Sequence, residues 1–110
     1  MNRSDTIISV ITVTNNDSRI VVGRVEELIS EISTKGTEFE IVIVDNGSKD
    51  GSIDSIVSHK RLMRHIRIVV LSRKFDQDVA FKAGLYTCVV DYEILFDLKF
   101  DPVHQIGEVV

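Results

Sequence analysis

The chain has 110 residues, of which 44% are hydrophobic and 27% are charged, and its 13 basic and 17 acidic residues give a formal net charge of −4. A composition this close to the globular average excludes wholesale disorder, and the negative charge argues against nucleic acid as a partner. No apolar run approaches the ~20 residues that cross a membrane, so we expect a cytoplasmic protein. The single cysteine, Cys88, argues against a disulfide and against a thiolate zinc site.

The first half of the chain predicts two buried strands that flank an amphipathic helix. Ile7–Thr14 form a β-branched run that ends in a polar cluster, and Phe39–Val44 form a second apolar run. Between these runs, apolar residues recur at helical spacing. Asp17 or Ser18 is expected to cap this helix at its start, and Gly36 is expected to end it.

The second half predicts two more helices and two more strands. A polar turn over Asp45–Gly51 precedes a short helix from Ser52 to about Lys60. A further helix begins at Asp76 or Gln77 and carries small residues on its packing face. Two apolar strands are expected here, at Ile66–Leu71 and Tyr92–Phe96.

Strands that alternate with helices predict a mostly parallel sheet, because parallel neighbours need a crossover connection, which is usually a helix. The expected fold class is therefore α/β, with three layers and helices on both faces of the sheet. In such sheets a ligand binds beyond the carboxyl ends of the strands. Polar residues follow all four predicted strands, at 15–17, 45–50, 73–77 and 97, so we expect these loops to converge at one edge.

Four segments of the sequence carry a resemblance to a known family. They read ISVITVTNND, EIVIVDNGSKDGS, VVLSRKFDQDVAFKAGL and DYEILFDLKFDP in chain order. In this order and spacing they resemble the N-terminal, nucleotide-sugar-binding half of family 2 glycosyltransferases, particularly the polyprenyl-phosphate sugar transferases. The resemblance implies a GT-A, Rossmann-like fold with strand order 3-2-1-4, and it implies that residues 1–110 form a single truncated nucleotide-sugar-binding domain.

The resemblance places nucleotide-binding residues at the first three strand ends. Asp45 would accept a hydrogen bond from the base, and Asn46 stands beside it in place of a second acid. Thr14 and Asp17 would line the nucleotide site, and Arg73 would face the pyrophosphate. Each also has a structural alternative, because acids and amides cap turns and helices and an arginine can form a surface salt bridge.

The fourth segment differs from the family at its metal site. There the family has a D-x-D motif that binds Mg²⁺ or Mn²⁺, which bridges the two phosphates of the donor. Asp97 matches the first acid, but Lys99 stands in place of the second, and an ammonium does not ligate a hard cation. Either Lys99 itself offsets the diphosphate charge, or the site has lost its activity. Asp101 is a further candidate acid in this segment.

The resemblance implies binding of a nucleoside-diphosphate sugar for transfer to an acceptor hydroxyl, as in a saccharide, or to a lipid phosphate. We expect the chain to be incomplete for catalysis alone, because the acceptor half of the family is absent, and we assign no catalytic base. The alternative is a catalytically inactive interaction module that forms a homodimer, or pairs with a partner, through the open edge of its sheet. A basic cluster is compatible with peripheral contact to an anionic membrane surface; it consists of Lys60, Arg61, Arg64 and Arg67.

Overall fold

The computed structural model describes residues 7–36, 38–88 and 92–99 of the chain. The strands in these ranges form one parallel sheet in the order β3-β2-β1-β4, which is the order that the resemblance implied. They are β1 (Ile7–Thr14), β2 (Glu38–Asp45), β3 (Ile66–Val70) and β4 (Tyr92–Leu95). β1 and β2 pair along their whole length, so they end at the same level, with Thr14 opposite Asp45.

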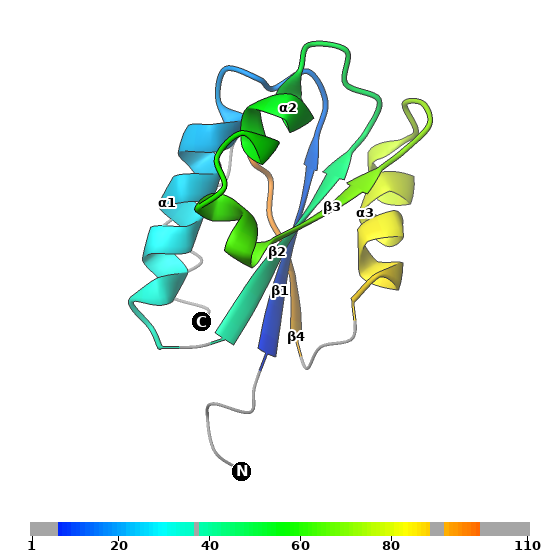
Figure 1. Cartoon of the computed structure of the whole chain (residues 1–110). Coiled ribbons are helices and arrows are strands. Elements are labelled where there is room, and N and C mark those ends of the chain that lie inside the picture. Colours follow the sequence, from blue (N-terminus) through cyan, green and yellow to red (C-terminus); the bar gives the residue numbers. More distant parts are fainter. Residues whose placement is uncertain (1–6, 37, 89–91, 100–110) are drawn as a thin grey trace.

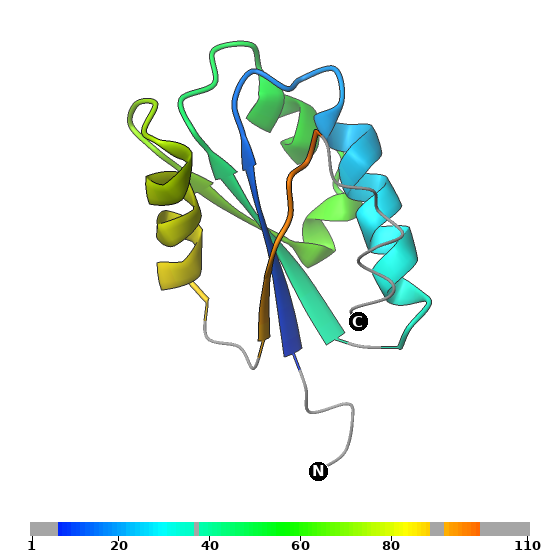
Figure 2. The same cartoon turned by 180° about the vertical axis from the view of Figure 1, so that it is seen from behind.

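Helices cover both faces of this sheet. One face carries α1 (Val21–Ser33), α2 (Ser52–Val57) and the 3-10 helix η2 (Leu62–His65), and the other carries α3 (Gln77–Tyr86), as Figure 1 shows. The view from behind shows β4 next to β1 (Figure 2). The predicted three-layer α/β architecture is confirmed. No helix in the described ranges is long and apolar enough to cross a membrane.

The two central strands bury side chains on both faces of the sheet. Val10, Ile41 and Ile43 are fully buried on the face that α1 covers, and Ile11 and Val42 are fully buried on the face that α3 covers. Burial of each such side chain contributes about 1.5–3 kcal/mol. These strands therefore give a rigid base to the loops at their ends.

α1 begins later than the sequence predicts. Neither Asp17 nor Ser18 caps it, because the helix begins at Val21 and Ile20 precedes it without a side-chain capping bond. The Asp17 carboxylate instead bonds backward, to the Thr14 hydroxyl, and only the Asp17 carbonyl accepts hydrogen bonds from the start of the helix. Asp17 is thereby held at the end of β1.

α2 is shorter than predicted, and the 3-10 helix that follows it is not predicted from the sequence. The helix α2 ends at Val57 rather than near Lys60. The Ser58 hydroxyl and Nδ1 of His59 lie 2.9 and 2.7 Å from the Ser55 carbonyl oxygen. These side chains use the carbonyl that another helical turn would need. Every strand begins and ends within one residue of its predicted bounds.

The close packing of α3 on the sheet depends on Gly84. A Cβ at this position would lie 2.6 Å from Cγ2 of Ile11 and 3.0 Å from Cγ2 of Val44. We expect Gly84→Ala to lower the free energy of unfolding by about 1–2 kcal/mol, because overpacking outweighs the better helix propensity of alanine. Denaturant-induced unfolding followed by circular dichroism measures this change.

Gly23 in α1 provides the matched control, since a Cβ there would meet nothing within 4 Å. Gly23→Ala is expected to raise the free energy of unfolding by about 0.5–1 kcal/mol, because it improves helix propensity without a new contact. Changes of the same sign and size in the two variants would contradict the role of Gly84.

Candidate functional site

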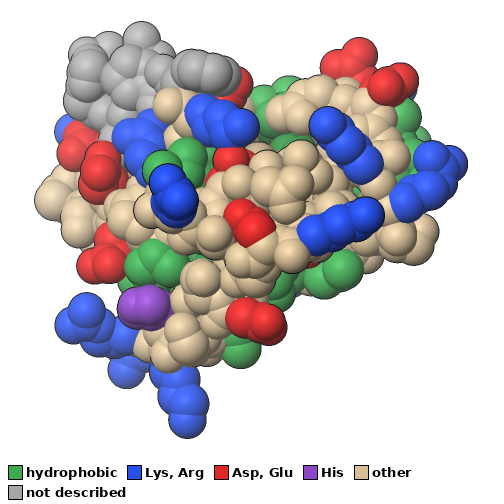
Figure 3. All heavy atoms as spheres, turned by 90° about the horizontal axis from the view of Figure 1, so that it is seen from above, with side chains coloured by type: hydrophobic (Ala, Val, Ile, Leu, Met, Phe, Trp, Pro, Cys, Tyr) green, Lys and Arg blue, Asp and Glu red, His purple; other side chains and the backbone are tan. Residues whose placement is uncertain are grey.

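A cavity of about 450 Å³ lies at the carboxyl ends of the strands. The loops that follow all four strands contribute to its lining, so the predicted convergence of these loops is confirmed. The lining residues are Val13, Asn15, Asp17, Asn46, Lys74, Phe75, Asp76, Gln77, Asp97 and Lys99. Seen from above, this end of the molecule carries acidic and basic side chains close together (Figure 3).

Asp17 is a buried acid of the cavity, held by several contacts. It is only 7% exposed, and its Oδ2 accepts hydrogen bonds from the Thr14 hydroxyl at 3.1 Å and from the Asn15 N–H at 3.0 Å. Its Oδ1 lies 3.3 Å from Nζ of Lys99. The sequence predicts that Thr14 and Asp17 both line the site. In the structure Asp17 lines it directly, and Thr14 orients the Asp17 carboxylate from below.

Asn46 links the loop after β2 to the loop after β3. Its Nδ2 donates to the Phe75 carbonyl at 2.9 Å, and its Oδ1 accepts from the Phe75 N–H at 2.8 Å. The Asn15 side chain in turn donates to the Asn46 carbonyl at 2.6 Å. The Asn46 amide thus binds a neighbouring backbone on both of its polar atoms while the residue lines the cavity.

Gly47 allows the same two loops to approach each other closely. Its φ is +77°, and a Cβ would lie 2.7 Å from the Lys74 nitrogen and 3.0 Å from the Arg73 carbonyl carbon. Both neighbours are backbone atoms. A residue without a side chain is therefore required where the loops meet.

Asp45 stands at the end of β2 but is not among the residues that line the cavity. It is 7% exposed, and its Oδ1 accepts a hydrogen bond from the Ser48 N–H at 3.0 Å. This contact is the turn-capping role that the sequence left open for it. Recognition of a base by Asp45 stays a prediction.

Asp50 organises the loop between β2 and α2. Its Oδ1 accepts from the Ser52 hydroxyl at 2.6 Å, and its Oδ2 accepts from the Ser18 N–H at 3.0 Å. These hydrogen bonds, with that of the Ser52 hydroxyl first, lower the pKa of Asp50 from 3.8 to about 2. The charged carboxylate therefore joins the start of α2 to the segment before α1.

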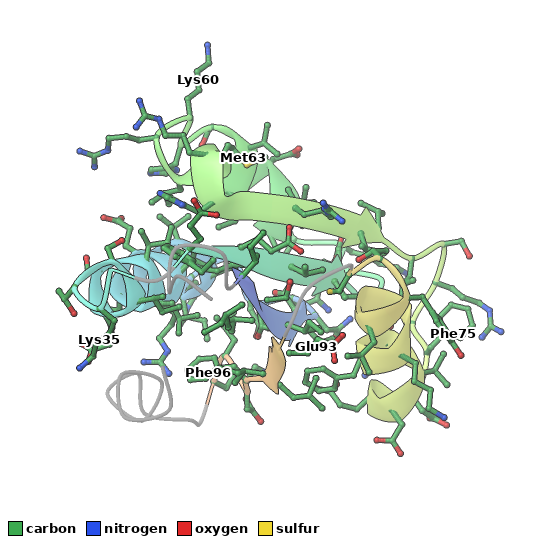
Figure 4. The ribbon with its side chains drawn as sticks, turned by 90° about the horizontal axis from the view of Figure 1, so that it is seen from below. Lys35, Lys60, Met63, Phe75, Glu93 and Phe96 are labelled. Atoms are coloured by element: carbon green, nitrogen blue, oxygen red, sulfur yellow. The ribbon has the colours of Figure 1, made fainter. Side chains whose placement is uncertain are left out.

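Arg73 and Lys74 differ in their relation to the cavity. The Arg73 guanidinium is exposed and lies 4.1 Å from the centre of the Phe75 ring, which Figure 4 shows beside α3. It is Lys74, not Arg73, that contributes to the lining. Contact of Arg73 with a pyrophosphate stays a prediction. Sequence reasoning missed Lys74, although its charge in a polar loop after a predicted strand is a usable signal.

Asp97 and Lys99 lie in the segment that follows β4. Oδ1 of Asp97 accepts a hydrogen bond from the Lys99 N–H at 2.9 Å, and the Lys99 side chain is 52% exposed. Within residues 7–36, 38–88 and 92–99, no three His, Cys, Asp or Glu side chains are grouped so that they could hold a metal ion. Asp101 lies outside these ranges. The ammonium of Lys99 contacts the carboxylate of Asp17. Asp17 and Asp97, together with Lys99, do not form a set of oxygen ligands that fits a divalent cation.

Solved structures share the fold of this chain. A crystal structure of residues 1–349 of TarS from S. aureus superposes with a TM-score of 0.71 at 17% identity, covering 94% of this chain and 31% of that chain. The mannosyltransferase PcManGT from Pyrobaculum calidifontis, in complex with GDP-Man and Mn²⁺, superposes with a TM-score of 0.66 at 18% identity, covering 91% of this chain and 30% of that chain. These neighbours are GT-A glycosyltransferases, so the GT-A fold is confirmed.

Curated proteins show similarity at the level of sequence. An uncharacterized glycosyltransferase of Synechocystis sp. is 34% identical over 73 residues, which cover 66% of this chain and 23% of that protein. The uncharacterized glycosyltransferase YkcC of Bacillus subtilis is 28% identical over 96 residues, which cover 86% of this chain and 30% of that protein. The chain thus spans less than a third of the length of these relatives. The family model "Glycosyl transferase family 2" matches residues 9–98, and the chain belongs to this family.

Proposed function

We propose that the cavity binds a nucleoside-diphosphate sugar and that residues 1–110 are the donor-binding domain of a glycosyltransferase. The observation that carries this proposal is that residues at the ends of all four strands line one cavity of about 450 Å³ in a family 2 chain. This volume lies within the range of about 300–1,000 Å³ that is typical of small-ligand sites. Parallel α/β sheets bind ligands at this end of their strands.

Solved neighbours support the donor class. TarS has been crystallised with UDP and with UDP-GlcNAc, and PcManGT with GDP-Man. In this chain we assign hydrogen bonding to the nucleotide to Asp17, which faces the cavity with a fixed carboxylate. Thr14 and Asn46 support the site through Asp17 and Phe75, and Asp45 and Arg73 flank it, where Asp45 would meet the base and Arg73 a phosphate.

The reaction that we propose transfers the sugar to an acceptor hydroxyl or to a lipid phosphate, as in the polyprenyl-phosphate type. We assign only the binding of the donor to the residues of this chain, which covers 23% and 30% of its two curated relatives. Three exposed basic side chains, Lys60, Arg61 and Arg64, would suit an anionic membrane surface near such a lipid acceptor. Figure 4 shows Lys60 pointing away from the body of the molecule.

Isothermal titration calorimetry with UDP, GDP and their sugars tests donor binding. We expect binding of at least one of them at millimolar or lower concentration. Gln77 is exposed at the start of α3 and lines the cavity, so Gln77→Trp should fill the cavity and weaken binding at least about tenfold. Lys82→Trp adds the same bulk to α3 at an exposed position outside the lining and should bind like the unmodified chain. Equal binding by the two variants would refute the site.

A second candidate function is pairing with another chain through β4. Within the described ranges β4 pairs only with β1, and Leu95 on this strand is 53% exposed. Absence of heat with every nucleotide, together with a dimer in sizing chromatography, would favour this interaction module over donor binding.

A further inference from the structure

Lys99 brings a positive charge into the wall of the cavity. Its ammonium lies 3.3 Å from Oδ1 of Asp17, and its side chain is 52% exposed. The hydrogen bond from the Lys99 N–H to Asp97 fixes the backbone that presents this side chain. The loop after β3 supplies Lys74 to the same lining. Two lysines from different loops therefore line one cavity.

The ion pair with Asp17 leaves Lys99 able to contact a ligand. The Asp17 side chain is 5% exposed, but the Lys99 side chain is 52% exposed, so water competes for the ammonium and side-chain entropy opposes its fixation. If the ammonium turns toward a ligand, Asp17 still accepts two hydrogen bonds, from the Thr14 hydroxyl and the Asn15 N–H. The carboxylate is thus not left without partners when Lys99 moves.

Three acids, Asp17, Asp76 and Asp97, line the cavity together with Lys74 and Lys99, so an anion bound there depends on the two lysines for positive charge. A lysine in place of an acid changes the local charge by two positive units, which equals the charge that a divalent cation brings. A bound dication would also lie close to the Lys99 ammonium and would be repelled by it. A diphosphate group, by contrast, would gain charge-assisted contacts with both lysines.

We propose that Lys99, assisted by Lys74, neutralises the diphosphate of the bound nucleotide, so that this chain binds its donor without a divalent cation. This inference rests on the proposed function, since it concerns how the same cavity holds the donor. In this proposal the Lys99 ammonium contacts the phosphates directly, in addition to forming an ion pair with Asp17.

Calorimetric titration of the whole chain with inorganic pyrophosphate, and with the nucleoside diphosphate that binds best, tests the inference in EDTA and in Mn²⁺. We expect the same affinity in both buffers. Lys99→Met, which keeps an unbranched apolar side chain but removes the ammonium, should lower both affinities about tenfold in EDTA. Lys99→Arg should retain them, and Lys82→Met, a charge loss on the exposed face of α3, should not change them.

Lys99→Asp provides the reciprocal test. This variant should not bind pyrophosphate or the nucleoside diphosphate in EDTA. Mn²⁺ should restore part of the binding, because the cation replaces the positive charge of Lys99. Thermal melting of each variant reports whether the chain is folded.

The outcomes separate this inference from the proposed function. Nucleotide binding by the unmodified chain that requires Mn²⁺ would overturn the inference and leave donor binding intact. Unchanged binding by a folded Lys99→Met variant would show that Lys99 only pairs with Asp17, and would also overturn it. No binding of any nucleotide in either buffer would overturn the proposed function and this inference together.

Discussion

Gly47→Ala is expected to lower the free energy of unfolding by about 3 kcal/mol. The alanine would have to adopt a φ of +77°, and its Cβ would lie 2.7 Å from the backbone nitrogen of Lys74. The left-handed conformation costs a non-glycine residue about 1–2 kcal/mol, and a forced shift of packed backbone adds about 1–3 kcal/mol. Chemical denaturation followed by circular dichroism measures the loss.

Gly51→Ala separates these two costs. Gly51 has a φ of +80°, but a Cβ there would meet nothing within 4 Å. This variant should lose only the conformational part, about 1–2 kcal/mol. If Gly47→Ala were no more destabilising than Gly51→Ala, the steric cost that we assign to the close approach of the two loops would be contradicted.

Gly47→Ala should also weaken nucleotide binding in the fraction of chains that remains folded. The backbone that it displaces belongs to the loop that carries Lys74 and Phe75, both of which line the cavity. Gly51 lies outside the lining, so Gly51→Ala should leave the affinity unchanged. Calorimetric titration of the two folded variants with the same nucleoside diphosphate compares them.

The strands and their parallel pairing could be predicted because their signals are local. The strands are short apolar runs, β-branched in Ile7–Thr14 and Ile66–Val70, and each is separated from the next by a stretch long enough for a crossover. Parallel connections then bring every strand end to the same edge, so the location of the cavity followed without any knowledge of contacts. The strand order itself came from the resemblance.

The contacts within the site could not be predicted in this way. Lys99 and Asp17 are 82 positions apart, and nothing local in the sequence shows that they pair. Arg73 and Lys74 are adjacent, and the path of the backbone past Gly47 decides that Lys74 lines the cavity. Aspartate is a residue type that often caps helices, but the hydrogen bond that Asp17 accepts from the Thr14 hydroxyl depends on where β1 ends.

Asn46→Ala is expected to destabilise the chain by about 2–3 kcal/mol. Asn46 is 2% exposed, and its amide makes two hydrogen bonds with the backbone of Phe75, at 2.9 and 2.8 Å. Alanine would leave both Phe75 backbone groups without these partners, and a polar group that loses its partner in a partly buried site costs about 1–3 kcal/mol. The free energy of unfolding in urea measures the effect.

Asn15→Ala is the matched control, because the half-buried Asn15 side chain makes a single hydrogen bond of this kind, to the Asn46 carbonyl. It should lose about 1 kcal/mol. Asn46 and Gly47 act on the same loop, at Phe75 and at Lys74. The double variant Asn46→Ala, Gly47→Ala should therefore lose less free energy of unfolding than the sum of the two single losses. Once one substitution has displaced the loop, the second removes few further contacts. Strict additivity in this cycle would show that the two residues hold the loop independently.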